Sequence, residues 1–259
     1  MLESVLRRFF HDRPGVPRPP DGVRVYAVGD IHGRSDLLRA LHRRVAADAA
    51  DAPDRDKRIV YLGDYIDRGL DSRGVIDILL DEPPPGVAPV HLMGNHEAML
   101  LRFLEDSSIG TGWLQFGGVE TLYSYGVKVT GPITDEAVVT VAQRRLGENL
   151  PERHLGFLRA LDLYHRAGDY LFVHAGLRPG VSLEEQAEDD LLWIRDDFLR
   201  SRADHGHVVV HGHSIQPESE IRPNRIGIDT GAYATGVLTC LVLDGDERRF
   251  LRTRPGDAS

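Results

Sequence analysis

The chain has 259 residues, of which 41% are hydrophobic and 27% are charged, and its formal net charge is −9. This length and composition are typical of a globular protein with one large domain or two small ones. An acidic chain repels phosphate backbones and anionic lipids. We therefore expect no nucleic-acid polymer as a partner. No apolar run reaches the roughly 18 residues of a membrane span, so we expect no stable membrane insertion.

The chain contains one cysteine, Cys240, within an apolar run. We expect it to pack in the core, as buried free cysteines usually do. One cysteine excludes an intramolecular disulfide, so the sequence gives no sign of an oxidising compartment. A cytoplasmic location is the corresponding expectation.

Residues 1–20 differ in character from the rest of the chain. They predict a short helix or a frayed tail, followed by a proline-rich linker over residues 14–20. A surface anchor is the alternative, although the stretch is only about three turns long. One domain is then expected over residues 21–259. The apolar stripe of the short helix is formed by Leu2, Val5, Leu6, Phe9 and Phe10.

The first third of the chain alternates strands with helices. Apolar runs at 23–30, 58–64 and 90–95 predict strands, and each ends in a Gly-Asp or Gly-Asn pair. Helical periodicity follows each strand. Ser35 and Ser72 are predicted to cap the first two helices, and the third is expected from about Glu97 to Glu105. This alternation indicates buried parallel strands.

Residues of about 105–165 predict a mostly helical insertion or cap region. Within it, residues 112–126 either shape a cap over the strand ends or pack as a helix pair, and packing is favoured for Trp113 and Leu122. Strands return at 169–176, 206–213 and 224–229. Residues 236–253 predict a hairpin that turns at Asp244-Gly245-Asp246. The predicted fold class is α/β, as one domain with two sheets.

Ligand-type side chains follow five of the predicted strands. Ligands of open α/β sheets bind at the carboxyl ends of strands, so we expect these side chains to converge. Carboxylates with imidazoles suit Mn, Fe or Zn. The set is too large for one ion and predicts two divalent ions, about 3.5–4 Å apart, that share a carboxylate and activate a water. The side chains are Asp30, His32, Asp64, Asp67, Arg68, Asn95, His96, His174, His211 and His213.

These residues lie in five short motifs, "GDIHG", "GDYIDRG", "GNHE", "VHAG" and "HGHS", between residues 29 and 213. With "IDTGA" at 228–232, they resemble the signatures of the calcineurin-like metallophosphoesterases. The closest resemblance is to the bacterial and phage form of the phosphoprotein phosphatases. It implies a two-sheet β-sandwich flanked by helices, in four α/β/β/α layers. It also implies hydrolysis of phosphomonoesters by a metal-bridging hydroxide attacking in line.

The resemblance also implies the ligands of two divalent ions, with Mn²⁺ expected first and Fe or Zn as alternatives. Asp30 and His32 would hold the first ion, and Asp64 would bridge both ions. Where other members of the superfamily have a further histidine ligand, this chain has Ile215, so the first ion should keep water positions. His211 is expected to support a ligand rather than to bind metal. The second ion would be completed by Asn95, His174 and His213.

His96 is the expected general acid, with Asp67 orienting its imidazole. The alternative for His96 is a helix-start residue bonded to backbone. Glu97 is expected to serve the first turn of its helix. The implied substrate-binding residues are Asn95, Arg68 and Arg195, the two arginines clamping phosphate oxygens. For Arg195, in the family's Trp-x-Arg pattern, a surface salt bridge with Asp196 or Asp197 is the alternative.

The favoured activity is a serine/threonine protein phosphatase acting on a phosphorylated protein. The enzymatic alternative is a symmetrical diadenosine tetraphosphate hydrolase, or another small-molecule phosphoesterase. In that dinucleotide group the second motif usually lacks its second Asp and the third ends in Asp, whereas this chain has Asp67 and Glu97. The eukaryotic phosphatases carry a tyrosine-containing loop at "IDTGA", but Tyr233 is not assigned that role. A non-catalytic phosphate-binding protein is a remote alternative, because no expected ligand or acid is missing.

Overall fold

The structure is a computed structural model that describes residues 15–254, 256 and 257. The predicted N-terminal helix lies outside these residues. Residues 15–20 form neither helix nor strand, and the linker role stays a prediction. The strands form two five-stranded sheets, which confirms the α/β prediction with two sheets.

The first sheet has the strand order β10-β9-β1-β2-β3. β1, β2 and β3 are parallel, and β9 and β10 add an antiparallel hairpin at the β1 edge. The hairpin turns at Gly245, whose φ of 55° suits glycine, so the predicted turn is confirmed. The strands are β1 (Val23–Val28), β2 (Asp56–Tyr61), β3 (Ala88–His91), β9 (Thr239–Asp244) and β10 (Glu247–Arg252).

The second sheet has the order β4-β5-β6-β8-β7. Its three central strands are parallel, while β4 and β7 are antiparallel edges that the sequence pattern did not predict. The strands are β4 (Tyr164–Ala167), β5 (Tyr170–Val173), β6 (Val208–His211), β7 (Glu220–Ile221) and β8 (Arg225–Gly227).

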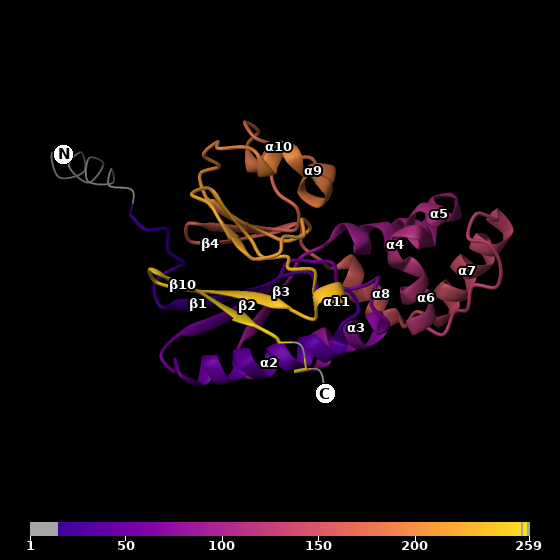
Figure 1. Cartoon of the computed structure of the whole chain (residues 1–259), viewed down its shortest axis with the longest axis horizontal. Helices are drawn as coiled ribbons and strands as arrows, with labels where there is room; N and C mark the ends of the chain where they lie inside the picture. The colour runs from indigo at the N-terminus through magenta and orange to yellow at the C-terminus, as the bar shows by residue number, and fades with distance from the viewer. Residues whose placement is uncertain (1–14, 255, 258–259) are drawn as a thin grey trace.

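Helices cover both outer faces and one end of the sandwich (Figure 1). α2 and α3 lie against the first sheet, α9 and α10 lie over the second, and the helices of residues 95–159 gather at one end. The longer helices are α2 (Ser35–Ala50), α3 (Ser72–Asp81), α4 (Asn95–Glu105), α6 (Val119–Ser124), α7 (Glu136–Asn149), α8 (Glu152–Arg159) and α9 (Glu188–Trp193). The short ones are η1 (Ser107–Ile109), α5 (Gly110–Trp113), the π-helix η2 (Leu114–Gly118), η3 (Leu183–Glu185), α10 (Asp196–Leu199) and α11 (Ala232–Thr235).

Three helix starts differ from the sequence prediction. Ser35 and Ser72 are first helical residues rather than caps, and the N-cap positions belong to Arg34 and Asp71. The Asp71 carboxylate accepts from the Gly74 amide at 3.0 Å and from the Ser35 hydroxyl at 2.5 Å. Asp71 therefore does the capping that was predicted for Ser72, whereas α2 has no side-chain cap. α4 begins at Asn95, before the predicted Glu97.

The core has three apolar clusters that follow the layers. One lies between the first sheet and its helices, one lies between the two sheets, and one lies under α9 and α10. Cys240 and Leu122 are buried in the first cluster, as predicted. Within the residues described, no helix has the length and apolar character that crossing a membrane requires. The sandwich fixes the carboxyl ends of the parallel strands, where the polar side chains lie.

Candidate metal centre and active site

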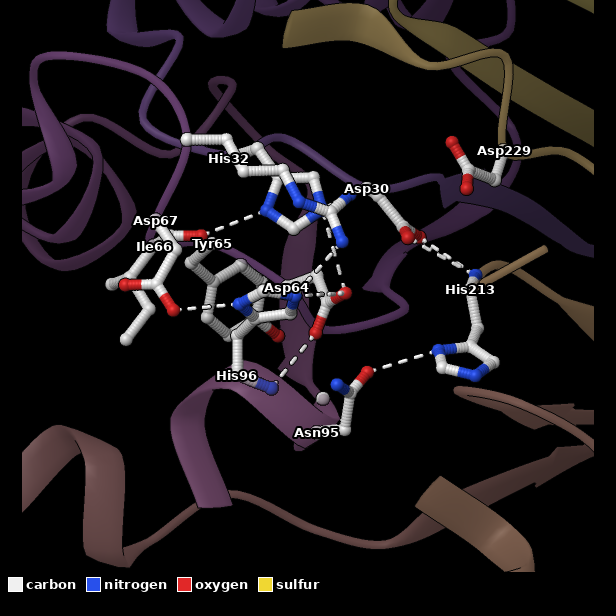
Figure 2. Close-up of polar contacts among 12 residues, drawn as sticks. Asp30, His32, Asp64, Tyr65, Ile66, Asp67, Asn95, His96, His213 and Asp229 are labelled. Atoms are coloured by element: carbon white, nitrogen blue, oxygen red, sulfur yellow. Dashed lines mark hydrogen bonds and ion pairs between the residues drawn. The ribbon is translucent and has the colours of Figure 1, made fainter. Parts of the chain in front are cut away.

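Most of the predicted side chains converge beyond the carboxyl ends of β1, β2, β3 and β6 (Figure 2), and His174, after β5, joins them at Asn95. Five site residues have positive φ, and they are the only non-glycine residues of the described chain that do. An L residue in this region is strained, and such strain collects at functional sites. The sharp turns after each strand aim the side chains at one point. The five are His32 (47°), Asp64 (52°), Asp67 (72°), Arg68 (65°) and His213 (60°).

Asp64 lies at the centre of the cluster and is buried. Its carboxylate oxygens are 3.5 Å from His32 Nε2 and 3.4 Å from His174 Nε2. Asp64 thus contacts both halves of the site, as a bridging ligand must.

The two imidazoles beside Asp64 present lone pairs to its carboxylate. His32 Nδ1 donates to the Ile66 carbonyl at 2.8 Å, and His174 Nδ1 donates to the Leu62 carbonyl at 2.8 Å. Burial lowers the pKa of both rings, that of His32 to about 3, so each ring is neutral. Each Nε2 then carries a lone pair that faces the carboxylate. Arg68 Nη1 donates to the lone pair of His32, at 2.9 Å. A cation placed between these lone pairs and the carboxylate would offset their repulsion, so the donor set fits a divalent metal.

A second group of donors surrounds the side chain of Asn95. Its Oδ1 lies 2.9 Å from His174 Nε2 and 2.9 Å from His213 Nδ1. Burial, followed by His174, lowers the pKa of His213 to about 2, so this ring is also neutral. Asp64, His174 and His213 place one ligand atom each within 4.8 Å of one another. These residues form a second pocket for a cation.

Asp30 lies on the side of the site next to His213. Both oxygens accept from the His213 amide, at 3.0 and 3.2 Å. Burial, followed by Asp229 and Asp64, raises the pKa of Asp30 well above its usual range. Asp229 Oδ2 is buried without a hydrogen-bond partner among the described residues. This surplus of buried negative charge is a further feature that a cation would offset.

His96 and Asp67 form a buried hydrogen-bonded pair. His96 Nδ1 donates to Asp67 Oδ2 at 2.6 Å. Burial lowers the pKa of His96, but Asp64 and Asp67 outweigh it, so the pKa is raised. His32, Asp64 and His96 also have ligand atoms within 4.8 Å of one another, so the distances alone would allow His96 as a metal ligand. The predicted second ligand of the first ion, with His32, was Asp30 instead. The bond to Asp67 and the raised pKa favour a proton donor over a ligand for His96.

Arg68 lies across the opening of the site. Its Nη1 is 2.9 Å from His32 Nε2 and its Nη2 is 3.1 Å from His96 Nε2. Its guanidinium carbon lies 5.0 Å from the centre of the Tyr233 ring. This ring also stands edge-on to His32, at 5.5 Å between centroids, so Tyr233 lies at the site although no role was assigned to it. Arg68 is placed to meet an anion above the imidazoles.

Glu97 has a wider role than the helix start predicted for it. It lies in the first turn of α4, where it was predicted to act, and its carboxylate accepts from Gly94 N at 2.9 Å. It also accepts from the amides of Asp64 (2.8 Å), Tyr65 (2.8 Å) and Ile66 (3.2 Å). Burial, followed by Asp64, raises the pKa of Glu97 to about 8, while the amides favour the ionised form. Glu97 therefore fixes the turn that carries Asp64.

Arg195 is exposed and lies on the other side of the site, at the start of α10. Its charge contributes to lowering the pKa of His213, and the ring of Trp193 lies 6.3 Å from that of His213. The alternative salt bridges are not found in the described part of the chain: Asp196 pairs with Arg200 at 2.9 Å and Asp197 with Arg178 at 3.2 Å.

His211 turns away from the metal ligands. Its Nδ1 lies 3.1 Å from the Gly212 carbonyl, its Nε2 lies 3.3 Å from Arg225, and its ring packs edge-on to Phe198. The predicted support of a ligand is not among the contacts of the described residues. The prediction assumed strand alternation up to His213, but β6 ends at His211 and His213 has positive φ.

Trp113 and Thr121 donate hydrogen bonds to the Asp67 carboxylate, and sequence reasoning missed both donors. Trp113 was expected only to pack, and it is indeed buried. Sequence reasoning also gave no role to Asp229, although this residue lies within the quoted "IDTGA". The signal available for Trp113 was its position in the glycine-rich stretch 110–118, but nothing local connects that stretch to Asp67.

The sequence profile of the calcineurin-like phosphoesterases matches residues 23–235, so the chain belongs to this family and is a metallophosphoesterase. Serine/threonine-protein phosphatase 2 of Salmonella typhimurium is 30% identical over 224 residues, covering 83% of this chain and 90% of the relative. Serine/threonine-protein phosphatase 1 of the same organism is 31% identical, covering 83% and 89%. The symmetrical bis(5'-nucleosyl)-tetraphosphatase of Nitrosomonas europaea is 28% identical over 203 residues, covering 76% and 63%.

Solved structures agree on the fold. A protein assigned as a diadenosine tetraphosphatase superposes with a TM-score of 0.61 at 22% identity, covering 92% of this chain and 97% of that one. A serine/threonine phosphatase from Saccharomyces cerevisiae superposes with a TM-score of 0.55 at 14% identity, covering 92% and 82%. These neighbours and the family confirm the predicted sandwich of two sheets with helices on both faces.

Proposed function

We propose that the chain is a serine/threonine protein phosphatase that uses two divalent metal ions, with His96 as its general acid. The observation that carries the proposal is the buried His96–Asp67 pair, at 2.6 Å. A serine or threonine alkoxide is a poor leaving group and needs a proton as the bond to phosphorus breaks. A nucleoside polyphosphate leaves as a stable anion and needs that proton far less. The pair therefore favours phosphomonoesters of alcohols.

In this proposal Asp30 and His32 hold the first ion, Asp64 holds both, and the second is completed by Asn95, His174 and His213. The facing lone pairs described above support His32, Asp64 and His174, and the contacts of Asn95 Oδ1 support the second ion. The Asp30 assignment rests on the family motif, because the ligand atoms grouped with His32 belong to Asp64 and His96. When bound, the two ions supply the activated water nucleophile and positive charge at the phosphoryl oxygens. Mn²⁺ is the proposed metal, because carboxylates, an amide and imidazoles make a mixed oxygen and nitrogen set; Fe or Zn is the alternative.

The protein groups then have separate tasks. Arg68 and Arg195, on opposite sides of the site, bind phosphoryl oxygens, and Asn95 contributes to substrate binding. His96 delivers its Nε2 proton to the departing oxygen while Asp67 stabilises the imidazolium and keeps its orientation. The two Salmonella relatives named as serine/threonine phosphatases support the substrate class. A cytoplasmic location stays a prediction that rests on the single cysteine.

The second candidate is a symmetrical diadenosine tetraphosphatase, which the Nitrosomonas relative favours. To separate the two, kcat/KM is measured with Mn²⁺ on a phosphoserine peptide and on diadenosine tetraphosphate. We expect the peptide to be preferred. We also expect His96→Asn to lower kcat on the peptide by roughly 10²–10⁴, the range of a positioned acid. A preference for the dinucleotide contradicts the proposal. His207→Asn, at the opposite end of β6, is the control for loss of an imidazole.

A further inference from the structure

The carboxylate of Asp67 is held by more than its bond to His96. Trp113 Nε1 donates to Oδ2 at 2.8 Å, the oxygen that also accepts from His96. The Thr121 hydroxyl donates to Oδ1 at 2.6 Å. Asp67 is completely buried, so three protein donors replace water around it. The loss of either Trp113 or Thr121 as a donor removes one of the three hydrogen bonds that hold the carboxylate.

The direction of the Thr121 bond follows from counting protons. Thr121 Oγ1 accepts from the Asp67 amide at 2.9 Å and lies 2.9 Å from Ser72 Oγ. A carboxylate only accepts, so the single hydroxyl proton of Thr121 points at Asp67 Oδ1. Ser72 therefore donates to Thr121. The resulting chain of bonds fixes the backbone and the side chain of Asp67 together.

The segment that supplies both donors is shaped for this contact. It runs through α5, η2 and α6, and the backbone of η2 is kinked at Gly117, which does not have helical geometry. Gly117 has φ 110°, and its carbonyl accepts from the Arg68 amide at 3.1 Å. A Cβ on Gly117 would lie 2.6 Å from Arg68 N, and one on Gly118 would lie 2.6 Å from the Trp113 ring. The two glycines thus let the segment approach both Asp67 and Arg68.

We propose that Trp113 and Thr121 are positioning residues for proton donation: they hold the Asp67 carboxylate in the orientation that aligns His96 with the leaving group. The inference rests on the proposed function of His96 as the general acid. It gives the helical region of residues 110–124 a task in the reaction in addition to packing. Because the two residues act through His96, their loss affects only substrates whose leaving group needs the proton.

The test uses full-length Trp113→Phe and Thr121→Val with bound metal. Phenylalanine keeps a ring beside Phe103, whose centroid lies 4.8 Å from that of Trp113, but removes the donor. Valine matches threonine in shape and lacks the hydroxyl, and Thr121→Ser restores it. Tyr125→Phe is the matched control, because it removes a buried hydroxyl of the same region that bonds His154 at 3.0 Å rather than Asp67.

We expect Trp113→Phe and Thr121→Val each to lower kcat about 10-fold on a phosphoserine peptide, but less than about 2-fold on p-nitrophenyl phosphate. KM and bound metal per chain stay unchanged. Thr121→Ser and Tyr125→Phe keep the wild-type ratio of the two rates. In a His96→Asn background the two substitutions have no further effect on kcat.

Equal losses on both substrates, an unchanged peptide rate, or a loss that persists in the His96→Asn background would overturn the inference. The failure of the proposed function looks different. If His96→Asn alone loses no more activity on the peptide than on p-nitrophenyl phosphate, the acid assignment is wrong. If His96→Asn is selective for the peptide and Trp113→Phe is not, only the positioning role is wrong.

Discussion

Glu97→Gln tests whether one carboxylate holds the turn that carries Asp64. The wild-type oxygens accept four backbone amides: Oε1 those of Tyr65 and Ile66, and Oε2 those of Gly94 and Asp64. A glutamine replaces one oxygen by an NH₂ group in either orientation. Two buried amides then lose their acceptor and face another donor.

The expected cost follows from those two amides. An unsatisfied buried donor costs about 1–3 kcal/mol, so the substitution lowers the free energy of unfolding by about 4 kcal/mol. For a domain of this size that corresponds to a Tm about 10 °C lower. If Glu97 served only the helix dipole, the loss would be about 0.3–1 kcal/mol. The two interpretations of Glu97 therefore predict losses in the free energy of unfolding that differ several-fold.

The assay is urea unfolding of metal-free protein at pH 9. Because burial raises the pKa of Glu97 to about 8, the wild-type side chain is ionised at this pH. Glu105→Gln, at the exposed end of the same helix, is the control and is expected to change stability by less than about 0.5 kcal/mol. A loss for Glu97→Gln within 1 kcal/mol of that control would refute the reasoning.

Two further predictions concern charge. Asp64→Asn removes the carboxylate shared by both donor groups, so we expect fewer than two metal ions per chain by elemental analysis and no measurable turnover; two retained ions would contradict the bridging assignment. Burial lowers the pKa of His42 from its ordinary 6.5 to about 4, so the folded chain binds fewer protons than the unfolded chain in that window. Stability therefore falls as the pH drops through it, by roughly 3 kcal/mol in full. Urea unfolding at pH 7 and pH 4.5 should show a smaller fall for His42→Gln than for the wild type, and equal falls would contradict this assignment.

The sequence predicts the strand ends and the polar side chains that follow them well, because both are local. An apolar run that stops at Gly-Asp or Gly-Asn shows where a buried strand ends and which side chain follows it. Asp30, Asp64 and Asn95 follow β1, β2 and β3 in this way, and the structure brings all three into one site. The parallel order of these strands is enough to place their carboxyl ends together.

Contacts between distant segments are not readable in the same way. The bonds of Trp113 and Thr121 to Asp67 join residues 46 and 54 positions apart, and the kink at Gly117 interrupts the helical periodicity between the two donors. The supporting role predicted for His211 stays a prediction, because a two-residue spacing implies one direction only while the strand continues, and β6 ends at His211. β4 and β7 were missed because a short edge strand of mixed polarity lacks both alternation and an apolar run.

The binuclear centre is tested most directly by a titration of metal-stripped protein with Mn²⁺. Bound metal and phosphate release from a phosphoserine peptide are measured at each step. We predict no activity without metal and full activity only when two ions are bound per chain, because Asp64 and the imidazoles form two adjacent donor groups. Activity that is complete at one ion per chain, or present without metal, would contradict the binuclear centre.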